Sequence, residues 1–257
     1  MKKDQKVFMI TKYNKFVKIL ESSEEASKYN RIIDYEYLNQ HCVTDNVIET
    51  CQTAKKHNFY AVCILPEFIS IAKSQLEDTD IKVISVVNFP TGKNKPIENY
   101  NECNTALVDG ADEINYVLNY EKLKKIKDKD DQEEENYVEI LDNTREIVQL
   151  CHSEGKVCKI IVETSELTYD EIKLACQIVM ETGADFVKTS TGYGKKGAEI
   201  DKVKFLRIIL RPEYKIEVSG GIKNLDDIKQ YINYVDRIGT SSVIDTDKLN
   251  LNLKTEY

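Results

Sequence analysis

No run of about 18 apolar residues occurs in the sequence, so no segment has the length and hydrophobicity of a membrane-spanning helix. The opening stretch MKKDQKVFMITKYNKFVKIL lacks the uninterrupted apolar core of a secretory signal, and we interpret it as an amphipathic N-terminal helix. Basic residues are not in excess, because 36 Lys and Arg against 44 Asp and Glu give a net charge of −8. That charge argues against a nucleic-acid partner and against binding to an anionic membrane.

Motifs for metals and nucleotides are missing as well. The seven cysteines are scattered without a Cys-x-x-Cys pair or metal-ligand spacing, which predicts reduced thiols, a cytoplasmic location and no metal site. Neither Gly-x-Gly-x-x-Gly nor Gly-Lys-Ser/Thr is present, so a dinucleotide-binding fold is disfavoured. Tryptophan is absent, and Gly and Pro number only 10 and 4, which we interpret as a background bias in composition.

The hydrophobic pattern, in contrast, is regular. Short β-like runs recur at Ile32–Asp34, Tyr60–Leu65, Lys82–Asn88, Glu113–Leu118, Val157–Glu163, Phe186–Lys188, Ile216–Val218 and Arg237–Gly239. Amphipathic stretches typical of helices lie between them, such as Thr44–Asn58, Pro96–Gly110, Val138–Gly155, Tyr169–Gly183 and Glu199–Leu210. Several of these stretches end at a glycine just before the next strand, as helices commonly do.

Strand followed by helix, repeated about eight times in roughly 230 residues, predicts an α/β fold, a (β/α)8 TIM barrel. We expect one barrel domain over residues 1–257, with residues 1–30 forming an N-terminal helical extension. The segment Glu121–Asn136 is almost wholly charged, and we expect a solvated loop insert that runs into the first turn of a helix. Docking of a protein partner is the alternative interpretation of this segment.

Lys188 is the residue that points most directly to chemistry. It ends an apolar stub, Ala184–Val187, and precedes the polar turn Thr189–Gly192. A cation at the end of a buried strand is unfavourable unless it is paired with an opposite charge or has a chemical function. Burial lowers the pKa of a lysine and exposes the neutral amine that attacks carbonyls, which favours imine chemistry. The alternative is a structural lysine paired with a neighbouring carboxylate.

Other polar side chains are expected to meet Lys188 at the mouth of the barrel. Active sites of parallel barrels lie at the carboxyl ends of the strands, and residues two apart on a strand share a face. On this basis Lys159, Asn115 and Glu217 point into the same mouth as Lys188. For Lys159 and Glu217 a buried salt bridge inside the barrel is the alternative interpretation.

Glycine-bearing loops follow the last two expected strands, at Val218–Lys223 and Gly239–Ser242. Glycines let backbone N–H groups approach a ligand closely, and barrels often bind phosphate at this position. The sequence therefore predicts a phosphate site here. Ordinary strand-to-helix turns also use Gly and Ser, and they are the alternative.

The runs AVCILPEFI, VVNFPTG, GADEIN, FVKTSTG, SGGI and IGTSS, in this order and spacing, resemble the deoxyribose-phosphate aldolase family from about Asp34 to Tyr257. The resemblance implies a (β/α)8 barrel that cleaves 2-deoxy-D-ribose 5-phosphate reversibly to glyceraldehyde 3-phosphate and acetaldehyde. The family does so through a lysine imine, without a metal or another cofactor, and Lys188 matches the imine-forming lysine. Barrels of this family often form dimers, which favours a homodimer.

The resemblance also implies roles for other residues of this chain. The matched positions near the substrate are Asp34, Cys63, Lys159 and Thr189, and those on the phosphate side are Gly192, Gly220, Gly221, Lys223, Gly239, Ser241 and Ser242. From its apolar surroundings alone, Cys63 is interpreted as a small core residue rather than a nucleophile. Tyr257 matches a tyrosine that the family's tail can bring into the site.

Two departures from the family pattern change the expected chemistry. The family carries an aspartate of its proton relay where this chain has Asn115, and a lysine where this chain has Glu217. An amide cannot accept and return a proton as a carboxylate does, and such assistance is typically worth about 10²–10⁴-fold in rate. A glutamate stabilises the ammonium form of Lys188, whereas a lysine destabilises it. At roughly 5 Å and an effective dielectric near 20 each effect is about 3 kcal/mol, enough to raise the lysine pKa by more than about two units.

Three compensations are open: Lys215 could pair with Glu217, Lys159 could supply the cation, or Glu217 could replace Asn115 in the relay. Two functions therefore follow from the sequence. The first is an active aldolase with a rearranged proton relay. The second is a weak or silent barrel that binds a sugar phosphate or a protein partner.

Overall fold

The computed structural model describes residues 25–126 and 131–242 of the chain. Within these ranges eight parallel strands form a closed barrel in which each strand pairs with the next along the chain and β8 returns to β1. The strands are β1 (Ile33–Tyr37), β2 (Ala61–Ile64), β3 (Lys82–Val87), β4 (Glu113–Val117), β5 (Val157–Ile161), β6 (Phe186–Lys188), β7 (Lys215–Ser219) and β8 (Arg237–Thr240). The expected (β/α)8 barrel is confirmed.

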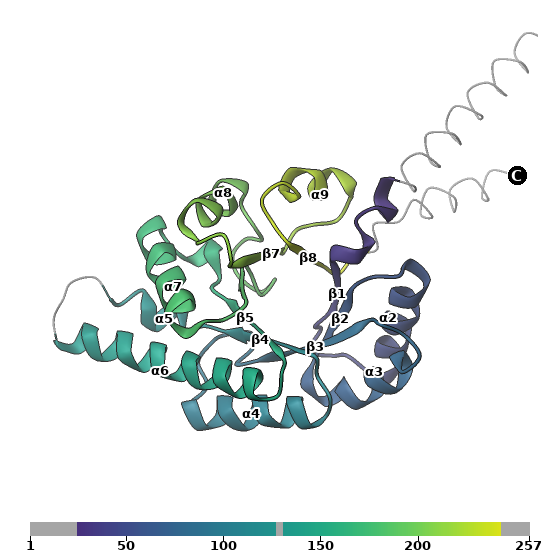
Figure 1. Cartoon of the computed structure of the whole chain (residues 1–257), viewed down its shortest axis with the longest axis horizontal. Coiled ribbons are helices and arrows are strands. Elements are labelled where there is room, and N and C mark those ends of the chain that lie inside the picture. Colours follow the sequence, from purple (N-terminus) through teal and green to yellow (C-terminus); the bar gives the residue numbers. More distant parts are fainter. Residues whose placement is uncertain (1–24, 127–130, 243–257) are drawn as a thin grey trace, which may run out of the picture.

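Helices surround the ring of strands (Figure 1). The α-helices are α2 (Thr44–His57), α3 (Ile69–Leu76), α4 (Pro96–Val108), α5 (Tyr120–Leu123), α6 (Asp131–Ser153), α7 (Tyr169–Thr182), α8 (Ile200–Ile209) and α9 (Leu225–Tyr231). Short 3₁₀ turns are η1 (Asn30–Ile32), η2 (Pro66–Phe68) and η3 (Thr164–Glu166). None of the helices in the described ranges is long and apolar enough to cross a membrane.

Capping residues fix the helix that leads into β6. Thr168 Oγ1 accepts a hydrogen bond from the Glu171 N–H, and the Glu171 carboxylate accepts the Thr168 N–H at 2.7 Å. This capping box satisfies N–H groups that the first turn of α7 would otherwise leave free. The helix ends at Gly183, whose φ of +75° turns the chain toward β6 and hence positions Lys188.

The interior of the barrel differs from the core around it. Outward-facing strand residues such as Ile114, Ile160 and Val187 pack against the helices in one large apolar cluster. Inside the barrel the apolar cluster is small and consists of Ala61, Cys63, Ile84 and Val86. The buried charged side chains of strands β1 and β4–β8 are Asp34, Glu113, Lys159, Lys188, Glu217 and Arg237. Because buried charges are stable only when paired, this interior must be organised by ion pairs.

The structure extends the sequence expectation in three places. Strand β1 continues to Tyr37 rather than ending at Asp34, because Glu36 and Tyr37 pair in register with β2. Helices α3 and α9 were not expected. Both are so short that the spacing of their apolar residues does not stand out as a helical pattern in the sequence. Helix α6 begins at Asp131 and therefore takes in the end of the charged segment. The N-terminal extension before residue 25 lies outside the described residues.

Candidate active site

Lys188 lies at the carboxyl end of β6, with only 2% of its side chain exposed. Its Nζ donates a hydrogen bond of 2.7 Å to Glu217 Oε1 on β7 and one of 2.5 Å to Glu36 Oε1 on β1. The register of β6 and β7 pairs Lys188 directly with Glu217, so the first contact is built into the sheet. Lys188 is thus an ammonium held between two carboxylates.

These carboxylates control the protonation of Lys188. Burial by itself lowers the pKa of this lysine, but Glu217 and Glu36 outweigh burial and hold the pKa well above its ordinary value. The direction agrees with the effect expected of a glutamate at position 217. At neutral pH the resting amine is therefore protonated and is not a nucleophile.

A second buried lysine continues the pairing deeper in the barrel. Lys159 Nζ lies 2.7 Å from Asp34 Oδ2, 2.7 Å from Glu217 Oε2 and 2.8 Å from Glu113 Oε2. The buried ion pair of Lys159 with Glu217, one of the two interpretations of these residues, is therefore present. Pairing of Lys215 with Glu217, one of the three compensations that the sequence left open, is not found among the described contacts, because Lys215 is exposed at the start of β7.

These contacts form one continuous series, which we call the charge chain: Arg237, Asp34, Lys159, Glu217, Lys188 and Glu36. Arg237 pairs with Asp34 at the deep end and approaches Glu113 at 3.5 Å. With Glu113 included, four carboxylates meet three cations, which leaves one negative charge in excess. An excess carboxylate in a dry interior favours binding a proton.

The carboxylates of the charge chain differ in proton affinity. Burial raises the pKa of Asp34 to about 6, although Lys159 beside it acts in the opposite direction. Burial likewise raises the pKa of Glu36 against the attraction of Lys188. For Glu217, burial is outweighed by Lys159 and Lys188, which hold its pKa below the usual range. Glu217 is thus a permanent anion, and protons exchange more readily at Asp34 and Glu36.

Asn115 is fully buried on β4, directly paired in register with Lys159 on β5. Its Nδ2 lies 3.4 Å from Cys63 Sγ, and its Oδ1 has no hydrogen-bond partner among the described residues. Burial raises the pKa of the Cys63 thiol, which keeps this cysteine protonated and supports its interpretation as a core residue. Asn115 can orient a polar group in the barrel, but it cannot carry a proton.

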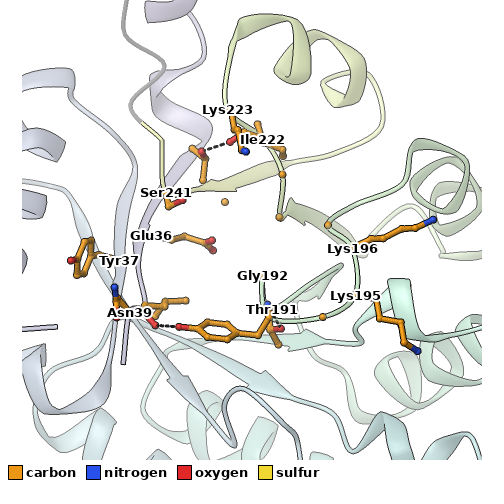
Figure 2. A pocket seen from close by; sticks show the side chains of 18 residues that line it. Glu36, Tyr37, Asn39, Thr191, Gly192, Lys195, Lys196, Ile222, Lys223 and Ser241 are labelled. Carbon is orange, nitrogen blue, oxygen red and sulfur yellow. Dashed lines mark hydrogen bonds between the residues drawn. The ribbon is translucent and has the colours of Figure 1, made fainter. Parts of the chain in front are cut away.

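A cavity of about 670 Å³ opens at the carboxyl ends of β1, β6, β7 and β8. It is lined by residues 36–39, 191–197, 220–223 and 239–241. Lysines 195, 196 and 223 are in this lining, and Glu36 is the acidic residue among its described members. Figure 2 shows the Glu36 side chain directed into the middle of the cavity. Of the two carboxylates that contact the Lys188 amine, Glu36 is therefore the one that an incoming ligand meets.

Glycines and a buried glutamate shape the loops around this cavity. A Cβ added at Gly220, where φ is +83°, would lie 2.8 Å from the Cα of Gly197, so the two loops touch through their backbones. Glu163 is fully buried and accepts hydrogen bonds from the Thr191 N–H at 2.9 Å and from Thr191 Oγ1 at 2.6 Å. The loop after β6, whose residues 191–197 line the cavity, is thereby anchored to the barrel.

The structure brings most of the residues singled out from the sequence to one end of the barrel. Those in the cavity lining are Gly192, Gly220, Gly221, Lys223, Gly239 and Ser241, and Ser242 follows directly. Those packed beneath the cavity inside the barrel are Asp34, Cys63, Asn115, Lys159, Lys188 and Glu217. Thr189 is buried at the β6–β7 seam, where its Oγ1 accepts the Ser219 N–H at 3.0 Å. Tyr257 lies outside the described residues.

Glu36 is the site residue that sequence reasoning missed. The first strand was expected to end at Asp34, which left Glu36 in a loop. Asp34 and Glu36 are two apart, so on a longer strand they share the inward face. The two acidic residues at alternate positions of the run IDYEY were the sequence feature that could have predicted Glu36 as a site residue.

Comparisons with known proteins agree with this geometry. The profile of the DeoC/LacD aldolase family matches residues 22–236. A deoxyribose-phosphate aldolase of Ureaplasma urealyticum is 38% identical over 219 residues, which cover 85% of this chain and 97% of that protein. One of Thermococcus kodakarensis is 38% identical over 215 residues, 82% of this chain and 92% of that protein. The solved structure of an aldolase called QR15 superposes with a TM-score of 0.76 at 33% identity, covering 88% of this chain and 98% of that one.

Proposed function

This chain belongs to the DeoC/LacD family of aldolases, and on that premise we propose that it cleaves 2-deoxy-D-ribose 5-phosphate through an imine on Lys188. The chain is a class I aldolase of the deoxyribose-phosphate type. Its proposed products are glyceraldehyde 3-phosphate and acetaldehyde, and the reaction is reversible.

The reaction begins at the aldehyde carbon of the open-chain sugar phosphate. The Lys188 amine adds to this carbon, and loss of water gives a protonated imine. A base then removes the proton of the C3 hydroxyl, the C2–C3 bond breaks, and its electrons move toward the imine nitrogen to form an enamine. Protonation of C2 and addition of water release acetaldehyde and restore the lysine. The nitrogen itself is the electron sink, so this route needs no metal.

The position of Lys188 is the observation that carries this proposal. It is a buried primary amine at the carboxyl end of a barrel strand, where barrel enzymes hold their catalytic groups. Its Nζ lies 2.5 Å from Glu36 Oε1, and Glu36 lines a cavity of about 670 Å³, which is large enough for a sugar phosphate. The ion pair with Glu217 therefore does not exclude a substrate from this end of the barrel.

The phosphate group is proposed to bind among the loops that line the cavity. The loops after β6, β7 and β8 meet there, and Gly192, Gly220 and Gly221 expose backbone to the cavity at positive φ. Lys223 and Ser241 add a cation and a hydroxyl to the same lining. Backbone N–H groups and a lysine are suited to a phosphate dianion.

Asn115 and Glu217 are proposed to serve in supporting roles. Asn115 cannot act as a base, so its amide orients groups in the barrel. Glu217 keeps both of its oxygens on lysines at 2.7 Å, which makes it a fixed anion for Lys188 and Lys159. The proton transfers of the reaction then require another group near the lysine nitrogen.

A second function is favoured by one observation. Lys188 has two carboxylate oxygens within 2.7 Å, and an ammonium locked between them does not attack an aldehyde. In that case the barrel binds a sugar phosphate without cleaving it, or serves a protein partner through the charged segment Glu121–Asn136. Both functions include binding of the sugar phosphate, so only a measurement of its cleavage distinguishes them.

The test is release of glyceraldehyde 3-phosphate from 2-deoxy-D-ribose 5-phosphate, followed with a coupled reduction of the product. We expect turnover by the natural protein, none by Lys188→Met, and unchanged turnover by Asp142→Asn, a change on an exposed face of α6. Binding of the sugar phosphate without turnover by the natural protein would favour the second function. Turnover that persists in Lys188→Met would overturn the imine proposal.

Location and assembly belong to the proposal as well. We place the protein in the cytoplasm, a choice supported by its seven cysteines, all of which lie in the described ranges as free thiols. The homodimer stays a prediction for which a measured solution mass is the test.

A further inference from the structure

We propose that Glu36 is a catalytic residue of this aldolase, the group that takes the proton from Lys188 and returns it to the leaving hydroxyl during imine formation. The proposal rests on the imine function of Lys188. It assigns to Glu36 the proton transfers that neither Asn115 nor Glu217 can perform.

Geometry separates Glu36 from the other carboxylates of the charge chain. Its Oε1 lies 2.5 Å from Lys188 Nζ, the shorter of the two contacts described for that amine. Its side chain is 12% exposed and lines the cavity, whereas Asp34 and Glu217 are 0% exposed. Glu36 therefore contacts both the reacting nitrogen and the space that a substrate must enter.

Glu217 contacts the same amine but cannot carry the proton. Both of its oxygens are engaged, one with Lys188 and one with Lys159. Protonating Glu217 would leave two buried lysines short of a partner, whereas protonating Glu36 breaks one contact that faces the cavity. Only Oε1 of Glu36 is hydrogen-bonded within the described ranges, so the carboxylate can turn toward a ligand by breaking that single contact.

Gly239 gives the two carboxylates the space they occupy. A Cβ added at position 239 would lie 2.5 Å from Glu36 Oε1 and 3.0 Å from Glu217 Oε1. The missing side chain at Gly239 of β8 therefore leaves room for the Glu36 carboxylate. The same space allows the Glu36 carboxylate to move from the lysine toward the cavity.

The proton balance of the proposed step closes without another reactant. The Lys188 ammonium gives a proton to the Glu36 carboxylate, and the neutral amine adds to the aldehyde carbon to form a carbinolamine. Protonated Glu36 then donates to the hydroxyl of the carbinolamine, which leaves as water while the nitrogen lone pair forms the imine. The sum is an ammonium and an aldehyde converted to a protonated imine and water, with Glu36 restored as a carboxylate.

Other charged and titratable side chains lie in the barrel interior and in the cavity lining around Glu36. They are Asp34 on β1, Cys63 on β2, Glu113 on β4, Lys159 on β5, Lys188 on β6, Glu217 on β7 and Arg237 on β8, with Tyr37, Tyr193, Lys195, Lys196 and Lys223 in the cavity lining. Burial raises the pKa of Glu36 against the attraction of Lys188, so a proton is held more readily here than on an exposed glutamate. A test must therefore separate the effect of its charge from the effect of its proton.

The two effects have opposite signs in Glu36→Gln. If Glu36 were only a static partner, removing its charge would lower the lysine pKa and speed imine formation. If Glu36 carries the proton, the amide cannot replace it, and imine formation slows by about 10²-fold or more. The measurement is the rate at which acetaldehyde and borohydride label Lys188 as a function of pH, with the turnover rate beside it.

Glu217→Gln is the matched variant, because it removes a second carboxylate at 2.7 Å from the same nitrogen. Its labelling profile is expected to move to lower pH, since only the static attraction is lost. Glu36→Ala adds a readout that misfolding cannot imitate, because formate entering the open cavity should restore labelling in proportion to its concentration. Circular dichroism confirms that each variant folds.

The outcomes are distinct. Slow labelling of Glu36→Gln together with formate rescue of Glu36→Ala supports the proposal. Labelling of Glu36→Gln as fast as the natural protein, or faster, overturns it while leaving the aldolase function intact. Absence of labelling in the natural protein at every pH would instead overturn the imine function on which the proposal rests.

Discussion

Lys159 and Lys188 are held by opposite oxygens of one carboxylate, with Glu217 Oε2 accepting from Lys159 and Oε1 from Lys188, each at 2.7 Å. Glu217 thereby links the buried ion pairs of Lys159, deep in the barrel, to Lys188, the proposed imine-forming residue. Lys159 and Arg237 neutralise the deep carboxylates, and Lys188 joins Glu217 to Glu36, which lines the cavity. The stability of the barrel and the reactivity of its lysine are therefore coupled through Glu217.

Removing Lys159 tests the buried ion pairs on one side of this link. In Lys159→Met three buried carboxylates lose the cation that lies within 2.8 Å of each. Breaking a buried ion pair in this way costs about 3–5 kcal/mol. We expect a fall of that size in the free energy of unfolding measured with urea. A fall no larger than that of the exposed change Asp142→Asn would contradict the assignment.

The raised pKa of Asp34 predicts a pH dependence of stability. Its pKa is about 6 in the folded state against 3.8 for an unperturbed aspartate, so the native protein holds a proton that the unfolded chain releases. Stability from this group is therefore fully present below about pH 4 and is lost as the pH rises to about 6. Urea unfolding at about pH 4.5 and about pH 6.5 should show this loss, and Asp34→Asn should reduce it. An equal loss in Asp34→Asn would contradict the account.

Gly239→Ala tests the space reserved for Glu36. The added methyl would meet Glu36 Oε1 at 2.5 Å and must displace that carboxylate. We expect turnover to fall about tenfold or more, because acid–base assistance at the amine is lost. Gly155→Ala is the control, since a Cβ there meets nothing within 4 Å but is strained by a φ of +65°. It should lose some stability without losing turnover.

Gly220→Ala tests the phosphate side of the cavity. Its Cβ would lie 2.8 Å from the Gly197 Cα at a φ of +83°, so the two loops must separate. Loss of well-placed phosphate contacts should raise KM for the sugar phosphate about tenfold. Labelling of Lys188 by acetaldehyde, which carries no phosphate, should stay unchanged. Equal losses with both ligands would place the effect at the lysine instead.

Much of this fold could be predicted from the sequence. The run Phe186–Lys188 was expected as a strand and is β6, and the glycine that ends α7 was expected as a helix stop. Both signals are local, since they depend on apolar patterning and on glycine. The convergence of Lys159, Lys188 and Glu217 followed from the rule that alternate strand residues share a face.

The partners of each charge could not be predicted in the same way. Lys159 and Lys215 were both candidates to pair with Glu217, and only the structure shows that Lys215 is exposed at the start of β7 while Lys159 Nζ lies 2.7 Å from Glu217 Oε2. Glu36 was missed because the end of β1 depends on its pairing with β2 and not on its own residues. Pairings of this kind are tertiary, and one sequence does not specify them.

The most direct test of the central claim is the site of imine formation. The protein is incubated with acetaldehyde and borohydride at neutral pH, and its peptides are mapped by mass spectrometry. The account predicts an ethyl group on Lys188, lost in Lys188→Met and suppressed by 2-deoxy-D-ribose 5-phosphate analogues that fill the cavity. Ethylation confined to exposed lysines, with Lys188 unmodified at every pH, would contradict it.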